Sequence, residues 1–192
     1  MVDILLPKNL PNTDITTHYA FVGDEAFPLK LYMLRPYARD RLTDARRIFN
    51  YRLSRARRVI ENSFGILTAR WQILLSTICV NPENAIAITK ALICLHNFIM
   101  ITDEEMSMPN ARLYCPPNFV DSMDEENGEW RNIRRDHGTL ADITRLGSNN
   151  ASRRATEQRN ILTDYFLSPI GEAQAPWQYN YAFRGININL PE

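Results

Sequence analysis

Apolar residues recur at helical spacing between positions 43 and 71, and a polar stripe runs beside them. At about 100° per residue, seven apolar side chains share one helix face: Phe49, Leu53, Ala56, Ile60, Phe64, Leu67 and Trp71. Five polar or small residues share the adjacent face: Asn50, Ser54, Arg57, Glu61 and Gly65. With Asp44 in the first turn, this pattern predicts a long helix from near Thr43 to about Ala69 that packs its apolar stripe on a core.

Two further helices are predicted downstream. Pro82 marks a helix start, because proline is favoured at the first helical position. The helix that follows, about 82–102, is apolar over so wide a surface that we expect it to be mostly buried. A last helix covers 152–167, where Pro169 stops it, and the tail 170–192 is predicted to be extended.

The remaining segments are predicted to be a short strand and loops. Residues 18–22 are aromatic and β-branched and run into Gly23 and Asp24, which is the pattern of a buried strand ending in a polar turn. Residues 26–37 contain two prolines and are predicted to form a loop on apolar surface. The chain therefore divides into a main segment, an acidic linker or loop, and a terminal helix with its tail, at 1–102, 103–149 and 150–192.

Charge is distributed unevenly, although the formal net charge is zero. Residues 35–70 hold ten Arg and no Lys against three acids, which nets +7, whereas 103–129 hold eight acids and one Arg, which nets −7. Guanidinium groups pair with phosphate oxygens in a bidentate fork, so a stretch rich in Arg alone suits nucleic acid. The alternative is a solvated basic face balanced by the acidic segment.

The three cysteines and the apolar stretches point to an intracellular chain without a membrane span. Cys79, Cys94 and Cys115 lack zinc spacing, and two of them lie in apolar surroundings, where we expect buried free thiols in a reducing compartment. The N-terminus has no secretory signal pattern. Lys90 and His96 interrupt the longest apolar stretch, which favours a core helix over a membrane span.

Asp24 and Glu61 are the candidate site residues. Asp24 follows the predicted strand, and Glu61 is the one carboxylate on the polar stripe of the long helix. Two carboxylates that converge from a strand end and a helix suit Mg²⁺ or Mn²⁺, and we expect them within about 8 Å of each other. Each also has a plainer interpretation: Asp24 as a turn residue, and Glu61 as a surface partner of Arg57.

No other catalytic constellation is evident. His96 is interpreted as a core histidine rather than a ligand, and Ser54, Ser63 and Cys94 lack a base partner. The sequence has no phosphate-binding glycine motif of the P-loop or dinucleotide type.

A series of short motifs carries a resemblance to a known family. In order they are Val22-Gly23-Asp24-Glu25-Ala26-Phe27-Pro28-Leu29, Leu34-Arg35-Pro36-Tyr37, Phe49-Asn50, Arg57, Glu61-Asn62-Ser63-Phe64-Gly65, Arg70-Trp71 and Leu95-His96-Asn97-Phe98. In order and spacing, residues 5–102 resemble the catalytic C-terminal half of Harbinger-type DDE transposases and the domesticated nucleases derived from them. Arg159, Leu162, Tyr165 and Phe166 resemble a weaker motif near that family's C-terminus.

The resemblance implies an α/β, RNase H-like fold, of which this chain would hold the helix-rich C-terminal half with a flexible acidic extension. Three acids in the family bind divalent metals, and the second and third correspond to Asp24 and Glu61. Asn50 and Gly65 would shape the active-site face, and four arginines would contact DNA phosphate: Arg52, Arg55, Arg57 and Arg58. The first acid belongs to an Asp-Gly-Thr segment that this sequence lacks, so we expect a fragment that is inactive alone.

Three functions follow from these observations. The first is part of a metal-dependent DNA endonuclease or transposase. The second is a domesticated, non-catalytic nuclear remnant that binds DNA or a partner, since a separate Myb-like protein often supplies DNA binding and nuclear entry in this family. The third is a helical interaction module whose basic face meets its acidic segment. The expected compartment is the nucleus, with the cytoplasm as the alternative. Neither the oligomeric state nor the target site is predicted.

Overall fold

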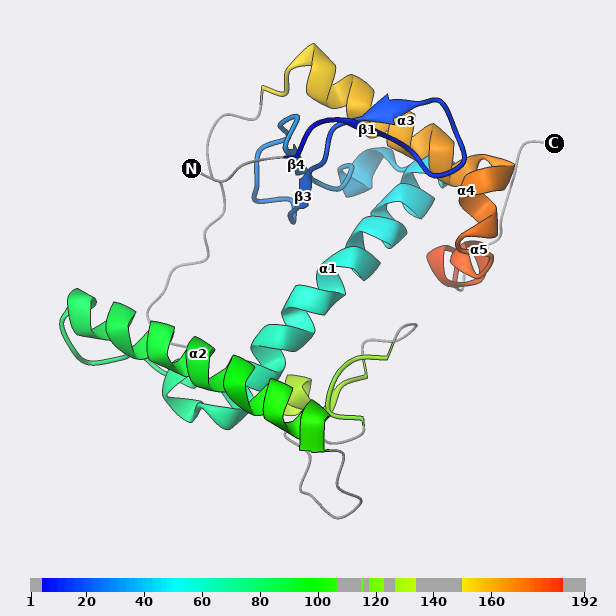
Figure 1. Ribbon diagram of the computed structural model, residues 1–192. Helices are drawn as coiled ribbons and strands as arrows, with labels where there is room; N and C mark the ends of the chain where they lie inside the picture. The colour runs from blue at the N-terminus through cyan, green and yellow to red at the C-terminus, as the bar shows by residue number, and fades with distance from the viewer. Residues whose placement is uncertain (1–4, 107–114, 116–117, 123–126, 134–149, 185–192) are drawn as a thin grey trace. The chain divides into compact units, whose positions relative to one another are not determined.

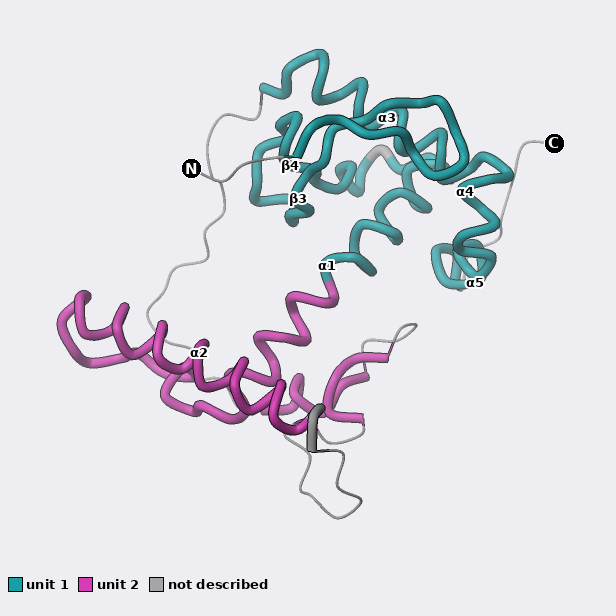
Figure 2. Tube along the Cα trace, viewed as in Figure 1, with its two compact units in different colours: residues 1–57, 142–192 teal, residues 58–141 magenta. Residues whose placement is uncertain are grey.

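A computed structural model describes residues 5–106, 115, 118–122, 127–133 and 150–184 (Figure 1). The chain divides into two compact units: unit 1, residues 1–57 with 142–192, and unit 2, residues 58–141 (Figure 2). The long helix α1, Asp44–Arg70, contributes its first half to unit 1 and its second half to unit 2.

Unit 1 combines two small sheets with helices. Strands β1 (Lys8–Asn9) and β2 (Thr16–Thr17) pair antiparallel, and β3 (Phe21–Val22) pairs parallel with β4 (Met33–Leu34). A short 3₁₀ turn, η1 (Arg39–Arg41), precedes α1. The C-terminal part adds α3 (Arg153–Leu167), α4 (Pro169–Ala173) and α5 (Gln178–Ala182). The result is helix-rich with small sheets, which is compatible with the α/β class.

The core of unit 1 lies between α1, the strands and α3. Its buried members are Leu29, Leu34, Tyr37, Phe49, Leu53 and Ala155. The ring of Phe49, 1% exposed, stacks on Phe166 of α3 at 6.0 Å and meets Tyr37 edge-on at 5.2 Å. Buried Gln158 of α3 donates to the carbonyl oxygens of His18 and Leu31 at 3.1 Å each, which ties α3 to the strand region.

Unit 2 consists of the second half of α1, the 3₁₀ turn η2 (Gln72–Leu75), α2 (Pro82–Met106) and a segment around the 3₁₀ turn η3 (Glu129–Asn132). Trp130 of η3 is 5% exposed, and Leu67 of α1 is 7% exposed. Trp130 lies against Gly65, where a Cβ atom would come within 2.4 Å of the indole.

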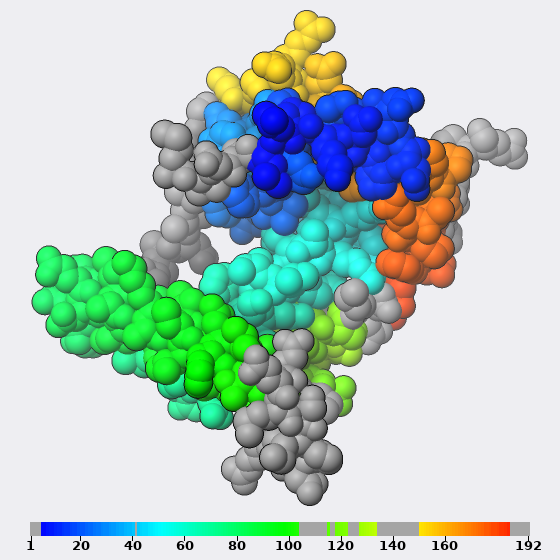
Figure 3. Space-filling view, in the orientation of Figure 1, coloured from blue at the N-terminus to red at the C-terminus, as the bar shows by residue number. Residues whose placement is uncertain are grey.

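The three predicted helices are confirmed, but the surroundings of two elements differ from expectation. None of the described residues of α2 from 82 to 103 is buried, so the prediction that this helix is mostly buried is wrong. Figure 3 shows one face of this helix at the surface, in green. The apolar stripe of α1 also becomes solvent-exposed in the second half of the helix, where Ile60 is 49% and Phe64 57% exposed. Both differences have one cause: the described part of unit 2 has too few elements to cover both helices.

Three smaller expectations also change. The strand at 18–22 is limited to Phe21–Val22, and the prediction that it is buried is wrong, because Phe21 is 52% exposed. The tail is not extended up to residue 184, because Ser168 accepts a hydrogen bond from the backbone of Gly171 and caps a new helix, α4. The cysteines are free, but Cys79 and Cys94 are exposed rather than buried.

By length and composition alone, residues 82–103 could cross a membrane: their mean hydropathy reaches 1.7. A single such helix is weak evidence for a span. The absence of a membrane partner therefore stays a prediction.

Candidate metal and nucleic-acid site

Asp24 directly follows β3, and its carboxylate closes a turn. Oδ1 accepts a hydrogen bond from the backbone N–H of Ala26 at 2.9 Å, a local pairing typical of aspartate in turns. Oδ2 makes no hydrogen bond within the described part of the chain, and the residue is half-buried. The turn and the ligand interpretations are compatible, because one carboxylate oxygen is left over for a ligand.

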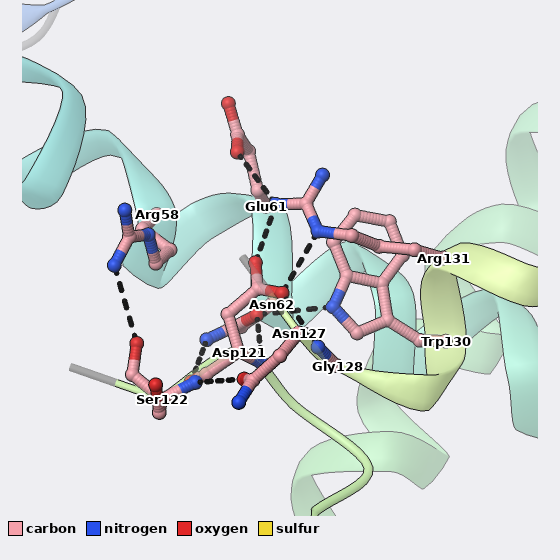
Figure 4. A network of polar contacts seen from close by, with 9 residues as sticks. All are labelled: Arg58, Glu61, Asn62, Asp121, Ser122, Asn127, Gly128, Trp130 and Arg131. Carbon is pink, nitrogen blue, oxygen red and sulfur yellow. Dashed lines mark hydrogen bonds and ion pairs between the residues drawn. The ribbon is translucent and has the colours of Figure 1, made fainter. Parts of the chain in front are cut away.

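Glu61 lies on the second half of α1 with 30% of its side chain exposed. Its Oε2 lies 3.6 Å from Nη2 of Arg131, a residue of η3 (Figure 4). A pair of this length at such exposure contributes little to stability. Arg131 is thus a cation beside Oε2 of Glu61 in this structure.

Arg131 is held in place mainly by Asp121, whose side chain is completely buried. Nε of Arg131 donates to Oδ1 of Asp121 at 2.8 Å, and Nη2 donates to Oδ2 (Figure 4). The backbone N–H of Gly128 donates to the same Oδ1 at 2.9 Å. Burial raises the pKa of Asp121, but these hydrogen bonds and the charges of Arg131 and Arg58 outweigh it, so the pKa falls below its ordinary value.

Asn62 joins this segment to α1. Its Oδ1 accepts from the backbone N–H of Asp121 at 3.0 Å and from Nε1 of Trp130 at 3.1 Å, and its Nδ2 donates to the carbonyl of Asp121 at 3.2 Å. One turn on, Gly65 leaves the space that the indole fills. The Asn62-to-Gly65 motif therefore has a packing function in unit 2, whatever Gly65 contributes to an active-site face.

Asn50 has a comparable anchoring position in unit 1. Its side-chain amide makes two hydrogen bonds with the backbone of Tyr37: Oδ1 accepts from the N–H at 2.8 Å, and Nδ2 donates to the carbonyl at 2.9 Å. This pair fixes the loop before α1 against the helix. The assignment of Asn50 to an active-site face stays a prediction.

Two of the four arginines predicted to contact DNA are engaged inside unit 1. Arg52 donates to Oε1 of Gln178 at 2.7 Å and to the carbonyl of Gly171 at 2.6 Å, and its guanidinium lies 4.5 Å from the Phe166 ring centre. Burial lowers the pKa of Arg52. Arg55 donates to the Tyr51 hydroxyl at 3.0 Å and stacks on Trp177.

The other two arginines predicted to contact DNA are neighbours in the sequence: Arg57 is assigned to unit 1, and Arg58 is the first residue of unit 2. Arg58 is buried, at 9% exposure, and donates to the carbonyl of Ser122 at 3.2 Å. Arg57 is half-buried and also has an interaction within the protein. All four side chains thus have protein contacts, and their binding to DNA stays a prediction.

Asp24 and Glu61 provide hard oxygen donors of the kind that Mg²⁺ and Mn²⁺ prefer. Among the described residues, however, no group of three His, Cys, Asp or Glu side chains could hold a metal ion. Asp24 belongs to unit 1 and Glu61 to unit 2, so their convergence stays a prediction. The described residues do not make a complete metal site.

Sequence reasoning missed the residues that surround Glu61. Asp121, Trp130 and Arg131 fall in a segment that composition predicts to be a loop or linker. The available signal was the clustering of glycine, tryptophan and arginine at 128–131, since an indole seldom stays in an acidic, solvated linker. His96, expected in a core, is half-buried on α2, and burial lowers its pKa.

Comparison with known proteins relates the N-terminal half of the chain to one family. No curated protein and no solved structure matches the chain. Residues 6–97, just under half of its length, match the model of a family described as DDE superfamily endonuclease. Asp24, Asn50, Glu61 and Gly65 lie inside the matched range, and Asp121, Arg131 and Arg159 lie outside it. Residues 6–97 are thus similar to DDE superfamily endonucleases, which generally use divalent metals and act on DNA.

Proposed function

We propose that this chain is part of a metal-dependent DDE endonuclease or transposase of the Harbinger type, acting on DNA phosphodiester bonds. The family match to residues 6–97 carries the proposal, because it contains both acids that the motifs assign as ligands, Asp24 and Glu61. The proposed architecture is the C-terminal half of an RNase H-like fold, and the proposed ion is Mg²⁺ or Mn²⁺.

In this function Asp24 and Glu61 provide two of three carboxylates. Asp24 is presented at the carboxyl end of β3 with Oδ2 available. Glu61 is presented by α1, but a metal ion at Oε2 requires Arg131 to move away, since both are cations. The third carboxylate would come from polypeptide other than residues 1–192.

The arginines of α1 would hold the DNA backbone in this function. Guanidinium forks match phosphate geometry. For Arg52 and Arg58, phosphate binding would replace hydrogen bonds to the carbonyl groups of Gly171 and Ser122. Arg57 lies on the same helix stripe as Glu61, so it is the first of the four arginines to substitute in a test of DNA binding.

The test is Mg²⁺- or Mn²⁺-dependent cleavage of duplex DNA. We expect no cleavage by residues 1–192 alone, because a two-metal site that lacks one carboxylate loses both negative charge and the correct placement of the metal ions. Each 1.36 kcal/mol of transition-state stabilisation that is lost lowers the rate about tenfold. Activity should appear when a segment with the first strands of the fold and their Asp-Gly-Thr acid is added.

The restored activity should then vanish with Asp24→Ala or Glu61→Ala. Matched controls are Asp164→Ala and Glu157→Ala, which remove exposed acids from α3. Cleavage that survives both site substitutions would place the chemistry elsewhere.

The exposed face of α2 favours a second candidate, a non-catalytic nuclear remnant that binds a protein partner. Phe98 is 67%, Ile86 55% and Ile101 56% exposed on this helix, and apolar surface of this kind is typical of interaction sites. A Myb-like DNA-binding protein is the partner that the family resemblance proposes. Co-purification of such a protein with an inactive chain, lost on Phe98→Ser, would support this candidate.

A further inference from the structure

A cavity of about 630 Å³ lies within unit 1, between α1, α3 and the strands. This volume is typical of pockets that bind small molecules. Most of its lining residues are apolar, and three of them are buried members of the core: Leu34, Phe49 and Leu53. The core thus fixes an apolar wall, which suits an apolar ligand.

The charged residues that line this cavity are all basic. Lys8 lies on β1 and is exposed, whereas Arg52 lies on α1 and is half-buried. Within the described part of the chain, no Asp or Glu lines the cavity. The charge of the lining is therefore complementary to an anion.

Arg52 is held in place from several sides, and one of its amino groups is left over. Nε donates to Gln178, Nη2 donates to the carbonyl of Gly171, and the guanidinium lies on the ring of Phe166, which also lines the cavity. Nη1 makes no hydrogen bond with any described residue. Burial lowers the pKa of Arg52 more than the charge of Glu172 raises it, so the cation is partly desolvated. A fixed, partly desolvated guanidinium attracts an anion more strongly than a fully solvated one does.

We infer that the cavity binds a small molecule with an apolar body and a single carboxylate group. The apolar body lies against the buried wall. Arg52 is the main partner of the carboxylate, because its planar fork matches carboxylate geometry, and Lys8 adds an exposed positive charge on the same cavity. One fixed cation beside an apolar wall matches one negative charge. The site uses neither Asp24 nor Glu61, so it does not depend on the proposed function.

The first experiment measures how alkyl compounds displace a dansyl-labelled fatty acid from the full chain, with EDTA present and without DNA. Decanoate should displace the probe at a concentration about tenfold lower than decanol or decyltrimethylammonium, as expected for a hydrogen-bonded ion pair added to the apolar contact. The two competitors have the same alkyl chain without the negative charge. Equal potency of the three compounds, or no binding of the probe, would overturn the inference.

The second experiment locates the site by substitution. Ala56 lines the cavity from an exposed position on α1, so Ala56→Trp should fill part of the cavity and still fold. Decanoate binding should weaken about tenfold, as expected when roughly two methylene groups lose their apolar contact. Ala151→Trp, at an exposed position outside the cavity, is the matched control. Lys8→Gln should weaken decanoate binding about two- to fivefold and leave decanol binding unchanged, as expected for an exposed ion pair, with Lys90→Gln as its control.

Arg52→Gln tests the main partner of the carboxylate. It should weaken decanoate binding about tenfold and bring decanoate and decanol to equal potency. If this variant does not fold by circular dichroism, because Arg52 also holds α4 and α5, then Lys8→Gln and Ala56→Trp carry the test. Equal decanoate binding by all folded variants would overturn the inference, since the probe would then bind elsewhere, such as on the exposed face of α2.

Discussion

At the scale of single residues, Asn62 and Gly65 determine how the second half of α1 is covered. Asn62 makes three hydrogen bonds to the segment that carries Asp121 and Trp130, and Gly65 leaves room for the indole. Motif reasoning identified both positions but assigned Gly65 to an active-site face. A packing partner that lies about 65 residues away and is held by one side-chain amide leaves no periodic signal in a sequence.

The substitution Gly65→Ala tests the packing of Trp130 on α1, because helix propensity and this packing predict changes in stability of opposite sign. In an exposed helix this change stabilises by about 1 kcal/mol. Here the new Cβ would lie 2.4 Å from the Trp130 indole, so we expect a destabilisation of about 1–3 kcal/mol, because the indole must be displaced. Urea denaturation measures the change, and hydrogen exchange of residues 127–133 should rise with it. A stabilised variant would contradict the packing of Trp130 on α1.

The lowered pKa of Asp121 predicts a pH dependence of unit 2. A carboxylate whose folded pKa lies below its unfolded value, about 3.9, stabilises the fold above that pH. The stabilisation is lost as pH falls through the folded pKa. We therefore expect Asp121→Asn to destabilise the chain at pH 7 and the difference from wild type to shrink below about pH 4. Denaturation of both proteins from pH 7 to pH 2 measures it; a constant difference would contradict the Asp121–Arg131 pairing.

At the scale of elements, helical periodicity located α1, α2 and α3 but not what covers them. The repeat of apolar positions depends on local geometry, whereas burial depends on which other elements are present. Phe49 and Leu53 meet α3 and are buried, yet Ile60 and Phe64 continue the same stripe into solvent. The α4 helix was missed for a related reason: Pro169 ends α3 and also begins the next helix, capped by Ser168.

Two phenylalanines of confirmed helices should respond differently to truncation. Phe49→Ala removes a ring that is 1% exposed between Tyr37 and Phe166, and should cost about 3–5 kcal/mol. Phe98→Ala removes a ring that is 67% exposed on α2, and should change stability by no more than about 0.5 kcal/mol. Equilibrium denaturation of the isolated chain measures both. A large loss with Phe98→Ala would show that α2 is covered in solution.

At the scale of the whole molecule, the sequence motifs of residues 5–102 and the family match of residues 6–97 both point to similarity with the DDE superfamily. The structure adds the division into two units, with Asp24 in one and Glu61 in the other. The sequence could suggest that these acids converge only through the resemblance, since no local pattern relates a strand end to a helix 37 residues later. The contact of Arg131 with Glu61 was not predictable either, because each of the two residues has the charge opposite to that of the stretch around or beside it, and the place of Arg131 depends on the buried Asp121.

Localised backbone cleavage by bound Fe²⁺ tests the central claim most directly. Iron replaces Mg²⁺ at oxygen sites, and with ascorbate and peroxide it generates radicals that cut the nearest peptide bonds. If Asp24 and Glu61 share a metal ion, the full chain should be cut beside both residues, and Asp24→Asn or Glu61→Gln should abolish both cuts. Cuts beside neither residue, or cuts beside one that persist when the other is substituted, would contradict a shared metal site.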